Sequence, residues 1–183
     1  METLHGNIWR LAEPTDFVVV PTNIGWRKGT TQGIMGAGLA AQARTRWPAV
    51  EASWGAHCMQ QVNKTSFGGF VVPLLLLTGD VGPAGIILAP TKPLNLREPH
   101  RSWQSPSDLE LVQLTLCFLL SERQAQALTL LQPEYRVLIP LLGAGHGGIP
   151  EAEAEQLIRD EVALAEHRAR FFLVKRTAAT PAP

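Results

Sequence analysis

The chain has 183 residues, of which 45% are hydrophobic, and its 16 Lys and Arg residues balance its 16 Asp and Glu residues. A chain of this length can bury one core, and a net charge of zero excludes an overall electrostatic attraction to nucleic acid or to anionic membranes. Any contact with nucleic acid must therefore be local.

The sequence shows no pattern typical of a signal peptide or of a membrane-spanning segment. The N-terminus METLHGNIWRLAEP lacks a basic start followed by an apolar run, and the longest apolar run, FVVPLLLL, contains a proline. Cys58 and Cys117 lack the spacing of a metal site and stand in apolar, helix-like surroundings, so we expect both to be buried, reduced thiols. These features predict a cytoplasmic protein without membrane contact.

Short β-rich runs alternate with longer helical patterns, which indicates an α/β fold. Several of these runs are apolar on both faces, as the inner strands of a covered sheet are. The runs expected to form strands are TLHGNIWRL (3–11), FVVVPT (17–22), FGGFVVPLLL (67–76), GIILAPT (85–91), RVLIPLL (136–142) and RFFLVKR (170–176). We therefore expect one three-layer domain.

Helices are expected to begin near Gly36, Val50, Ser107 and Pro150. The last of them has proline and glutamates in its first turn and basic residues in its last turn, which favours both of its ends. The tail TAATPAP has too little apolar content to pack, and no repeat or linker interrupts the chain. The domain is thus expected to span 1–176, with a disordered tail at 177–183.

Ligands of open α/β sheets bind at the carboxyl ends of the strands, and two loops at such ends are rich in glycine. Each precedes a predicted helix, whose free N–H groups can hold a phosphate, so the pair suits the two phosphates of a diphosphate. Either loop could instead be only a tight turn, and neither matches GxxxxGK[ST]. Their glycines are Gly33, Gly36 and Gly38 in the first, and Gly143, Gly145, Gly147 and Gly148 in the second.

Lys92 follows the nearly uncharged run GIILAPT, and Pro93 favours an extended conformation there. The amine is therefore expected at the same edge of the sheet as the two glycine-rich loops. A lysine in this position is either solvated or, in a partly apolar pocket, a nucleophile of lowered pKa that can form a Schiff base.

Five motifs in this order, GNIWRLA, VVVPTN, GIMGAGLAAQ, APTK and IPLLGAGHGG, resemble those of the macrodomains, which bind ADP-ribose. The resemblance covers roughly residues 3 to 175. Within that superfamily, QGIMGAGLAAQARTRWP, PTK and LGAGHGG are most similar to the DNA ADP-ribosyl glycohydrolase antitoxins and the terminal ADP-ribose glycohydrolases. The resemblance implies a mixed central sheet of about six strands in an α/β/α sandwich.

The resemblance also implies a role for each matching residue. Asn7 and Ile8 match the element that holds adenine, although many macrodomains have aspartate in place of Asn7. Asn23 matches the asparagine beside the distal ribose, and Lys92 matches a catalytic lysine. The phosphate loops correspond to Gly36, Ala37, Gly38 and Leu39, and to Gly143, Ala144, Gly145, His146 and Gly147, and the remaining residues expected at the ligand are Gly33, Met35 and Thr91.

Two loops, 24–34 and 93–106, are longer than is usual in the family. Trp26, Arg27 and Lys28 in the first either cover the ligand, contact the acceptor of the ADP-ribose, or form a solvated loop tip. In the second, Trp103 either stacks on a base while Arg97 and Arg101 meet phosphates, or all three pack a surface loop. His146 is either a proton shuttle or a bystander.

The resemblance implies a hydrolase that removes ADP-ribose from a modified acceptor, with Lys92 as nucleophile and His146 as the candidate shuttle. No cofactor or metal is expected, because His5, His57, His100 and His167 lack metal spacing. The implied partners are ADP-ribose, an ADP-ribosylated acceptor such as DNA, and a cognate ADP-ribosyltransferase toxin. A non-catalytic ADP-ribose-binding module and an ADP-ribose phosphate phosphatase are the alternatives, and neither requires Lys92.

Overall fold

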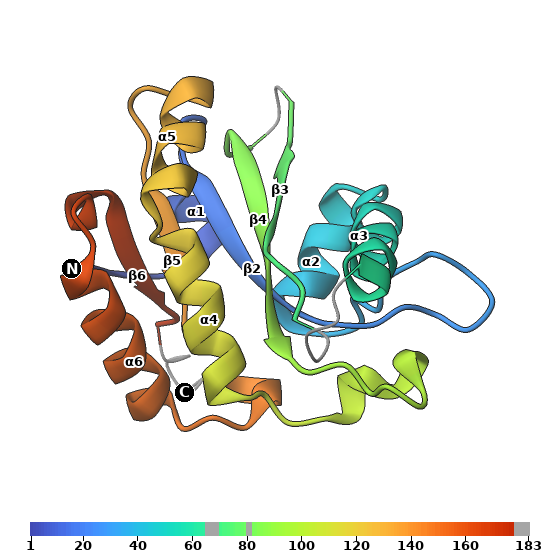
Figure 1. Ribbon diagram of the computed structural model, residues 1–183. Coiled ribbons are helices and arrows are strands. Elements are labelled where there is room, and N and C mark those ends of the chain that lie inside the picture. Colours follow the sequence, from blue (N-terminus) through green and yellow to red (C-terminus); the bar gives the residue numbers. More distant parts are fainter. Residues whose placement is uncertain (65–69, 80–81, 178–183) are drawn as a thin grey trace, which may run out of the picture.

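The computed structural model describes residues 1–64, 70–79 and 82–177 (Figure 1). Within these ranges the strands are β1 (Glu2–His5), β2 (Phe17–Asn23), β3 (Leu74–Leu77), β4 (Gly85–Lys92), β5 (Val137–Pro140) and β6 (Phe171–Lys175). The helices are α1 (Ile8–Leu11), α2 (Gly38–Arg46), α3 (Val50–Lys64), α4 (Leu109–Leu119), α5 (Glu122–Leu131) and α6 (Glu151–Leu164), with short 3-10 helices η1 (Pro99–Gln104), η2 (Gly145–Gly147) and η3 (Arg168–Arg170). None of these described helices is long and apolar enough to cross a membrane.

The strands form one mixed sheet in the order β1-β6-β5-β2-β4-β3. Neighbouring strands are parallel except for β3, which runs antiparallel to β4 at one edge. Strand β2 lies between β5 and β4, and all three run in the same direction. The mixed sheet of about six strands that the sequence predicts is confirmed.

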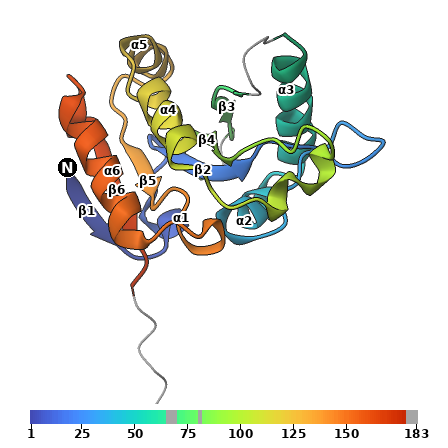
Figure 2. The same cartoon turned by 60° about the horizontal axis from the view of Figure 1, so that its bottom comes forward.

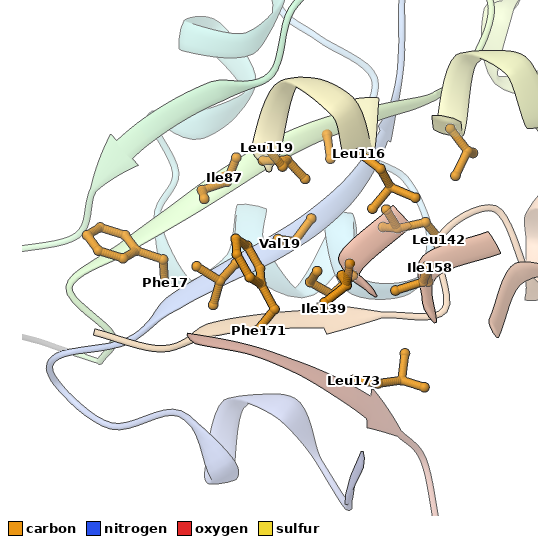
Figure 3. Packing of buried hydrophobic residues seen from close by; sticks show 14 of the residues in the cluster. Phe17, Val19, Ile87, Leu116, Leu119, Ile139, Leu142, Ile158, Phe171 and Leu173 are labelled. Atoms are coloured by element: carbon orange, nitrogen blue, oxygen red, sulfur yellow. The ribbon is translucent and has the colours of Figure 1, made fainter. Parts of the chain in front are cut away.

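Helices cover both faces of the sheet, and each face has its own apolar core. Alternate residues of β2 divide between them, because successive side chains of a strand point to opposite faces. Phe17 and Val19 pack with α4, α5 and α6, as Figure 3 shows, whereas Val18 and Val20 pack with α1, α2 and α3. All four side chains have no exposed surface, and burying one contributes roughly 1.5–3 kcal/mol. The three-layer arrangement follows from strands that are apolar on both faces.

The predicted strand over residues 3–11 is wrong in its second half. Strand β1 ends at His5, and the chain then turns at Gly6, where φ is 150°. The Asn7 side chain accepts a hydrogen bond from the Trp9 N–H at 3.0 Å and caps α1. A capping asparagine with a glycine before it therefore overrides the strand propensity of the following apolar residues.

Four further expectations need correction or a limit. The predicted strand over 67–76 is shorter, since β3 begins only after Pro73, and residues 67–69 lie outside the described part of the chain. The helical stretch that begins after Ser107 is divided at Ser121, whose hydroxyl caps α5 by accepting from the Gln124 N–H. Cys117 is exposed, whereas Cys58 is buried as expected. Most of the tail, 178–183, also lies outside the described residues.

Candidate functional site

The three loops that the sequence singles out meet at one edge of the sheet. Strands β5, β2 and β4 are parallel neighbours, so their carboxyl ends lie side by side. In the register of β2 and β4, Asn23 pairs with Lys92 after a bulge between Thr22 and Asn23. Figure 2 shows this edge turned forward, with the loop after β5 beside the one after β4. The strand order thus makes a single site of the three loops.

The first glycine-rich loop leaves its backbone open to a ligand. Gly36, Ala37 and Gly38 are exposed, and a Cβ placed on either glycine would meet no atom within 4 Å. Ala37 caps α2 without a side-chain hydrogen bond, so the N–H groups of the first turn have no side-chain acceptor. A helix N-terminus in this state favours an anion, because its free N–H groups and the helix dipole both point toward it.

The second glycine-rich loop combines open and packed glycines. Gly145 is exposed, has φ of 62° and would place a Cβ in open space. A Cβ on Gly143 would collide with Ile149, and one on Gly147 would collide with the Ser107 hydroxyl. Gly143 and Gly147 therefore fix the loop against its supports, while Gly145 presents its backbone to the site.

Lys92 lies at the end of β4 with its amine between two loops. The Nζ atom donates to the carbonyl oxygen of Trp103 and to that of His146, each at 3.0 Å. Partial burial lowers the pKa of Lys92 below its ordinary value, because desolvation penalises the ammonium form. No carboxylate within the described part of the chain forms an ion pair with it. The amine is thus held by backbone oxygens alone.

Three buried side-chain oxygens in the described chain lack a hydrogen-bond partner, and all lie at or next to this edge: Thr22 Oγ1, Asn23 Oδ1 and Ser107 Oγ. Buried polar atoms without partners are rare in folded proteins. The amide of Asn23 is held by its other end, since Nδ2 donates to the Ile34 carbonyl at 2.7 Å. This leaves Oδ1 free to accept a hydrogen bond from a ligand.

The fold is similar to those of several solved structures. The macrodomain of Mycobacterium tuberculosis DarG is similar at 23% identity, with 97% of each chain covered and a TM-score of 0.68. The macrodomain of Thermus aquaticus DarG is similar at 24% identity, with 96% of this chain and 97% of that chain covered and a TM-score of 0.66. Thermosipho africanus DarTG in complex with ADP-ribose matches at 19% identity over 91% of this chain and 39% of its own, with a TM-score of 0.61.

The chain has the macrodomain fold. No known family profile and no curated protein matches its sequence. The likeness therefore concerns the fold, and the chemistry of the site has to be argued from this chain's own residues.

Several residues expected at the ligand are packed inside the protein. Ile8 and Met35 are buried in the core beside α2, so their side chains are closed to a ligand. Gly33 donates its N–H to the Glu51 carbonyl at 2.7 Å and has no room for a side chain beside Trp54.

Two of the predicted ligand residues already have hydrogen-bond partners in the described structure. The buried Thr91 hydroxyl donates to the carbonyl of Thr22 at 3.2 Å and joins β4 to β2. The Asn7 side chain is exposed, and its oxygen already accepts the bond that caps α1. An amide oxygen has two lone pairs, so this leaves one acceptor position at Asn7.

The two extended loops differ in how much of them is free. In the first, Trp26 is partly buried against the core and pairs with Gly33, and Arg27 forms an ion pair with Glu51 at 3.1 Å. The exposed part of this loop is its tip, around Lys28. In the second loop the side chain of Trp103 is 50% exposed, next to the backbone oxygen that binds Lys92.

Sequence reasoning missed the residues that join β4 to the second glycine-rich loop. The N–H of Ser107 donates to the Gly147 carbonyl at 2.8 Å, and the N–H of Asp108 donates to the Thr91 carbonyl at 3.0 Å. Asp108 also caps α4. A serine and an aspartate before an apolar run signal a helix start, but no local pattern reveals the contact with Gly147.

Proposed function

We propose that this macrodomain is an ADP-ribosyl hydrolase that releases ADP-ribose from a modified acceptor through the amine of Lys92. The observation that carries the proposal is the position of that amine at the end of β4, where it donates at 3.0 Å to the Trp103 carbonyl and at 3.0 Å to the His146 carbonyl of the second glycine-rich loop. A binding module needs the loops but gains nothing from a partly desolvated lysine at this point.

The loops would hold the diphosphate of ADP-ribose. The open backbone at Gly36 and Gly38 and at Gly145 provides N–H groups for the phosphate oxygens. The free Oδ1 of Asn23 would accept from a hydroxyl of the distal ribose, and that ribose would then lie beside Lys92, because Asn23 pairs with Lys92 in the register of β2 and β4. Support for ADP-ribose as the ligand comes from the similar DarTG structure, which contains it.

The ligand contacts proposed for the whole site are those expected from the resemblance, with the buried residues acting through backbone atoms. Asn7 and Ile8 would contact adenine, and Thr91 would support the sugar end. The phosphate contacts would come from Gly36, Ala37, Gly38 and Leu39, and from Gly143, Ala144, Gly145, His146 and Gly147, while Gly33 and Met35 would support the first of these loops beneath the ligand.

In the chemical step, the lone pair of the neutral Lys92 amine forms a bond to the anomeric carbon of the distal ribose. The bond from that carbon to the acceptor breaks, and the acceptor leaves with the electron pair and takes up a proton. The bond from the anomeric carbon to the ring oxygen then breaks while one proton passes from nitrogen to that oxygen, which gives a protonated imine. Water hydrolyses this imine to ADP-ribose and the free amine, with release of a proton. Lowering of the Lys92 pKa by burial increases the fraction of amine that can attack.

His146 is the proposed proton carrier for these steps. The backbone oxygen of His146 accepts a hydrogen bond from the Lys92 amine, and the side chain of the same residue is exposed. The imidazole therefore belongs to a residue that contacts the amine directly. A side chain in that place can take up a proton from water and return it to the leaving group.

The acceptor that we propose is nucleic acid, in particular DNA. Trp103, whose backbone carbonyl binds the Lys92 amine, has a half-exposed indole that can stack on a base, and Arg97 and Arg101 of the same loop are exposed. A chain with zero net charge requires such local contacts. A transferase that attaches the ADP-ribose would be the functional partner.

The test is parallel incubation with ADP-ribosylated DNA, ADP-ribosylated protein and ADP-ribose phosphate, with release of ADP-ribose or phosphate as the readout. We expect ADP-ribose from the modified DNA. Release of phosphate only would establish the phosphatase instead, and micromolar ADP-ribose binding without any product would leave a binding module.

A further inference from the structure

The carbonyl of Trp103, which binds the Lys92 amine, belongs to the short helix η1 on a long surface loop. Backbone oxygens on such loops usually move with the loop. The contacts that hold η1 in place therefore determine where the amine can be.

Ser102 holds η1 from inside. It has no exposed surface, its hydroxyl accepts from the Asn95 N–H at 2.9 Å, and it donates to the Pro99 carbonyl at 3.0 Å. The Asn95 side chain in turn accepts from the N–H groups of Arg97 and Glu98 at 3.1 and 2.9 Å. The buried Ser102 hydroxyl thus ties η1 both to its first residue, Pro99, and to Asn95 in the segment before it.

Gly25, at the start of the first extended loop, packs closely against η1. A Cβ on Gly25 would collide with the Pro99 carbonyl and would come within 3.0 Å of the Ser102 side chain. Its φ does not lie in the left-handed region, so close packing is what requires glycine here. The first extended loop therefore packs directly on the second.

These contacts form a closed ring through Lys92. The N–H of Ile24 donates to the Lys92 carbonyl at 3.0 Å, Gly25 follows and packs on Ser102, and the next residue, Trp103, accepts from the Lys92 amine. The backbone and the side-chain amine of the same lysine are thus tied to one rigid unit. The second amine bond, to the His146 carbonyl, comes from the opposite side.

We propose that Ser102 and Gly25 are positioning residues for Lys92, because they fix the Trp103 carbonyl at hydrogen-bond distance from its amine. The consequence for rate rests on the proposed function, since a nucleophile must meet the anomeric carbon in one orientation. A displacement of about 1 Å can cost on the order of a hundredfold in rate.

Two substitutions reach this unit from different sides. Ser102→Ala removes both hydroxyl bonds with little change of shape, whereas Gly25→Ala keeps the Ser102 hydroxyl and displaces η1 through contact with the Pro99 carbonyl and the Ser102 side chain. Ser105→Ala is the matched control, because Ser105 ends the same turn and no hydrogen bond of its hydroxyl is found in the described structure. All three lie outside the phosphate loops.

The first readout is the reaction of Lys92 with limiting acetic anhydride, measured by peptide mass relative to Lys28, which is exposed. Ser102→Ala and Gly25→Ala should each raise Lys92 labelling severalfold, while Ser105→Ala should leave it unchanged. Equal labelling in all four proteins would overturn the proposal. This readout needs no turnover, so it stands even if the chain hydrolyses nothing and the proposed function fails.

The second readout is the division between kcat and ADP-ribose affinity. Both positioning variants should lower kcat by about tenfold or more and keep the ADP-ribose Kd within about twofold, since the missing interaction orients the nucleophile alone. A parallel loss of kcat and affinity would show a merely structural role. Unchanged kcat despite increased labelling would equally contradict the positioning role.

Discussion

At the scale of single residues, the role of Lys92 is the point that decides between an enzyme and a binding module. Lys92→Ala should lower turnover by several orders of magnitude and leave ADP-ribose affinity within a few fold, because the bond to the anomeric carbon exists only along the reaction path. Lys92→Arg should be equally inactive, since arginine keeps the charge but cannot form the imine. Single-turnover release of ADP-ribose and calorimetry measure the two quantities.

Trapping of the covalent intermediate is an independent test of whether Lys92 is the nucleophile. Borohydride added during turnover should reduce the imine and leave a stable adduct on Lys92, found by peptide mass. Full activity of Lys92→Ala would sink the lysine mechanism whatever the trapping shows.

The pH dependence of the reaction follows from the same amine. Attack requires the neutral form, which predominates above the pKa, and burial lowers the pKa of Lys92 from its ordinary value of about 10.4. The rate constant kcat/KM should therefore rise with pH and level off below that ordinary value. A profile that falls between about pH 7 and pH 9 would contradict an amine nucleophile.

At the scale of elements, the contribution of the second glycine-rich loop to ADP-ribose binding can be measured separately from its contribution to the stability of the fold. Gly145→Val should weaken ADP-ribose binding at least tenfold, because the side chain occupies the space where the backbone meets a phosphate. The substitution also strains a backbone with φ of 62°, at about 1–2 kcal/mol.

Gly29→Val is the control for that strain. Gly29 has φ of 74°, an equally open Cβ position and a place at the tip of the first extended loop. Both variants should lower the melting temperature alike, and only Gly145→Val should lose affinity in calorimetry. Unchanged affinity in Gly145→Val would remove the second loop from the site, and equal loss in both variants would assign the effect to strain.

A substitution at Gly55 tests the packing of α3 against the loop that contains Thr31 and Gly33. Glycine to alanine inside a helix normally stabilises by about 1 kcal/mol, but a Cβ on Gly55 would collide with the Thr31 carbonyl and the Gly33 backbone. Gly55→Ala should therefore destabilise the fold by about 1–3 kcal/mol in urea unfolding. A gain in stability would show that the loop and α3 are not packed in this way.

At the scale of the whole molecule, a net charge of zero means that any binding of nucleic acid has to rest on local groups of charged residues. Charge reversal of Arg97 and Arg101 should slow release of ADP-ribose from modified DNA and reduce the salt dependence of DNA binding, because removing one phosphate-binding cation lowers the slope by about one. Affinity for free ADP-ribose should not change. Equal loss of both activities would mean that this loop shapes the ADP-ribose pocket itself.

The sequence by itself predicted most of the elements and the three loops that meet at the candidate site. Strands apolar on both faces required two covered faces, and the glycine-rich loops and Lys92 could be found because glycine and a charged residue after an apolar run are local signals. The helix starts near Val50 and Pro150 were likewise predicted from their caps. The extent of the domain, 1–176, stays a prediction.

Only the tertiary structure decided how these parts meet. The strand order β5-β2-β4 brings the three loops together. The packing of these loops places the Trp103 and His146 carbonyls at hydrogen-bond distance from the Lys92 amine. Every residue except proline has the same backbone groups, so no side-chain pattern marks a carbonyl that will accept from a distant lysine. The contact of Gly25 with Ser102 was hidden for a related reason: close approach depends on where two loops, 77 residues apart in the chain, are placed by the sheet.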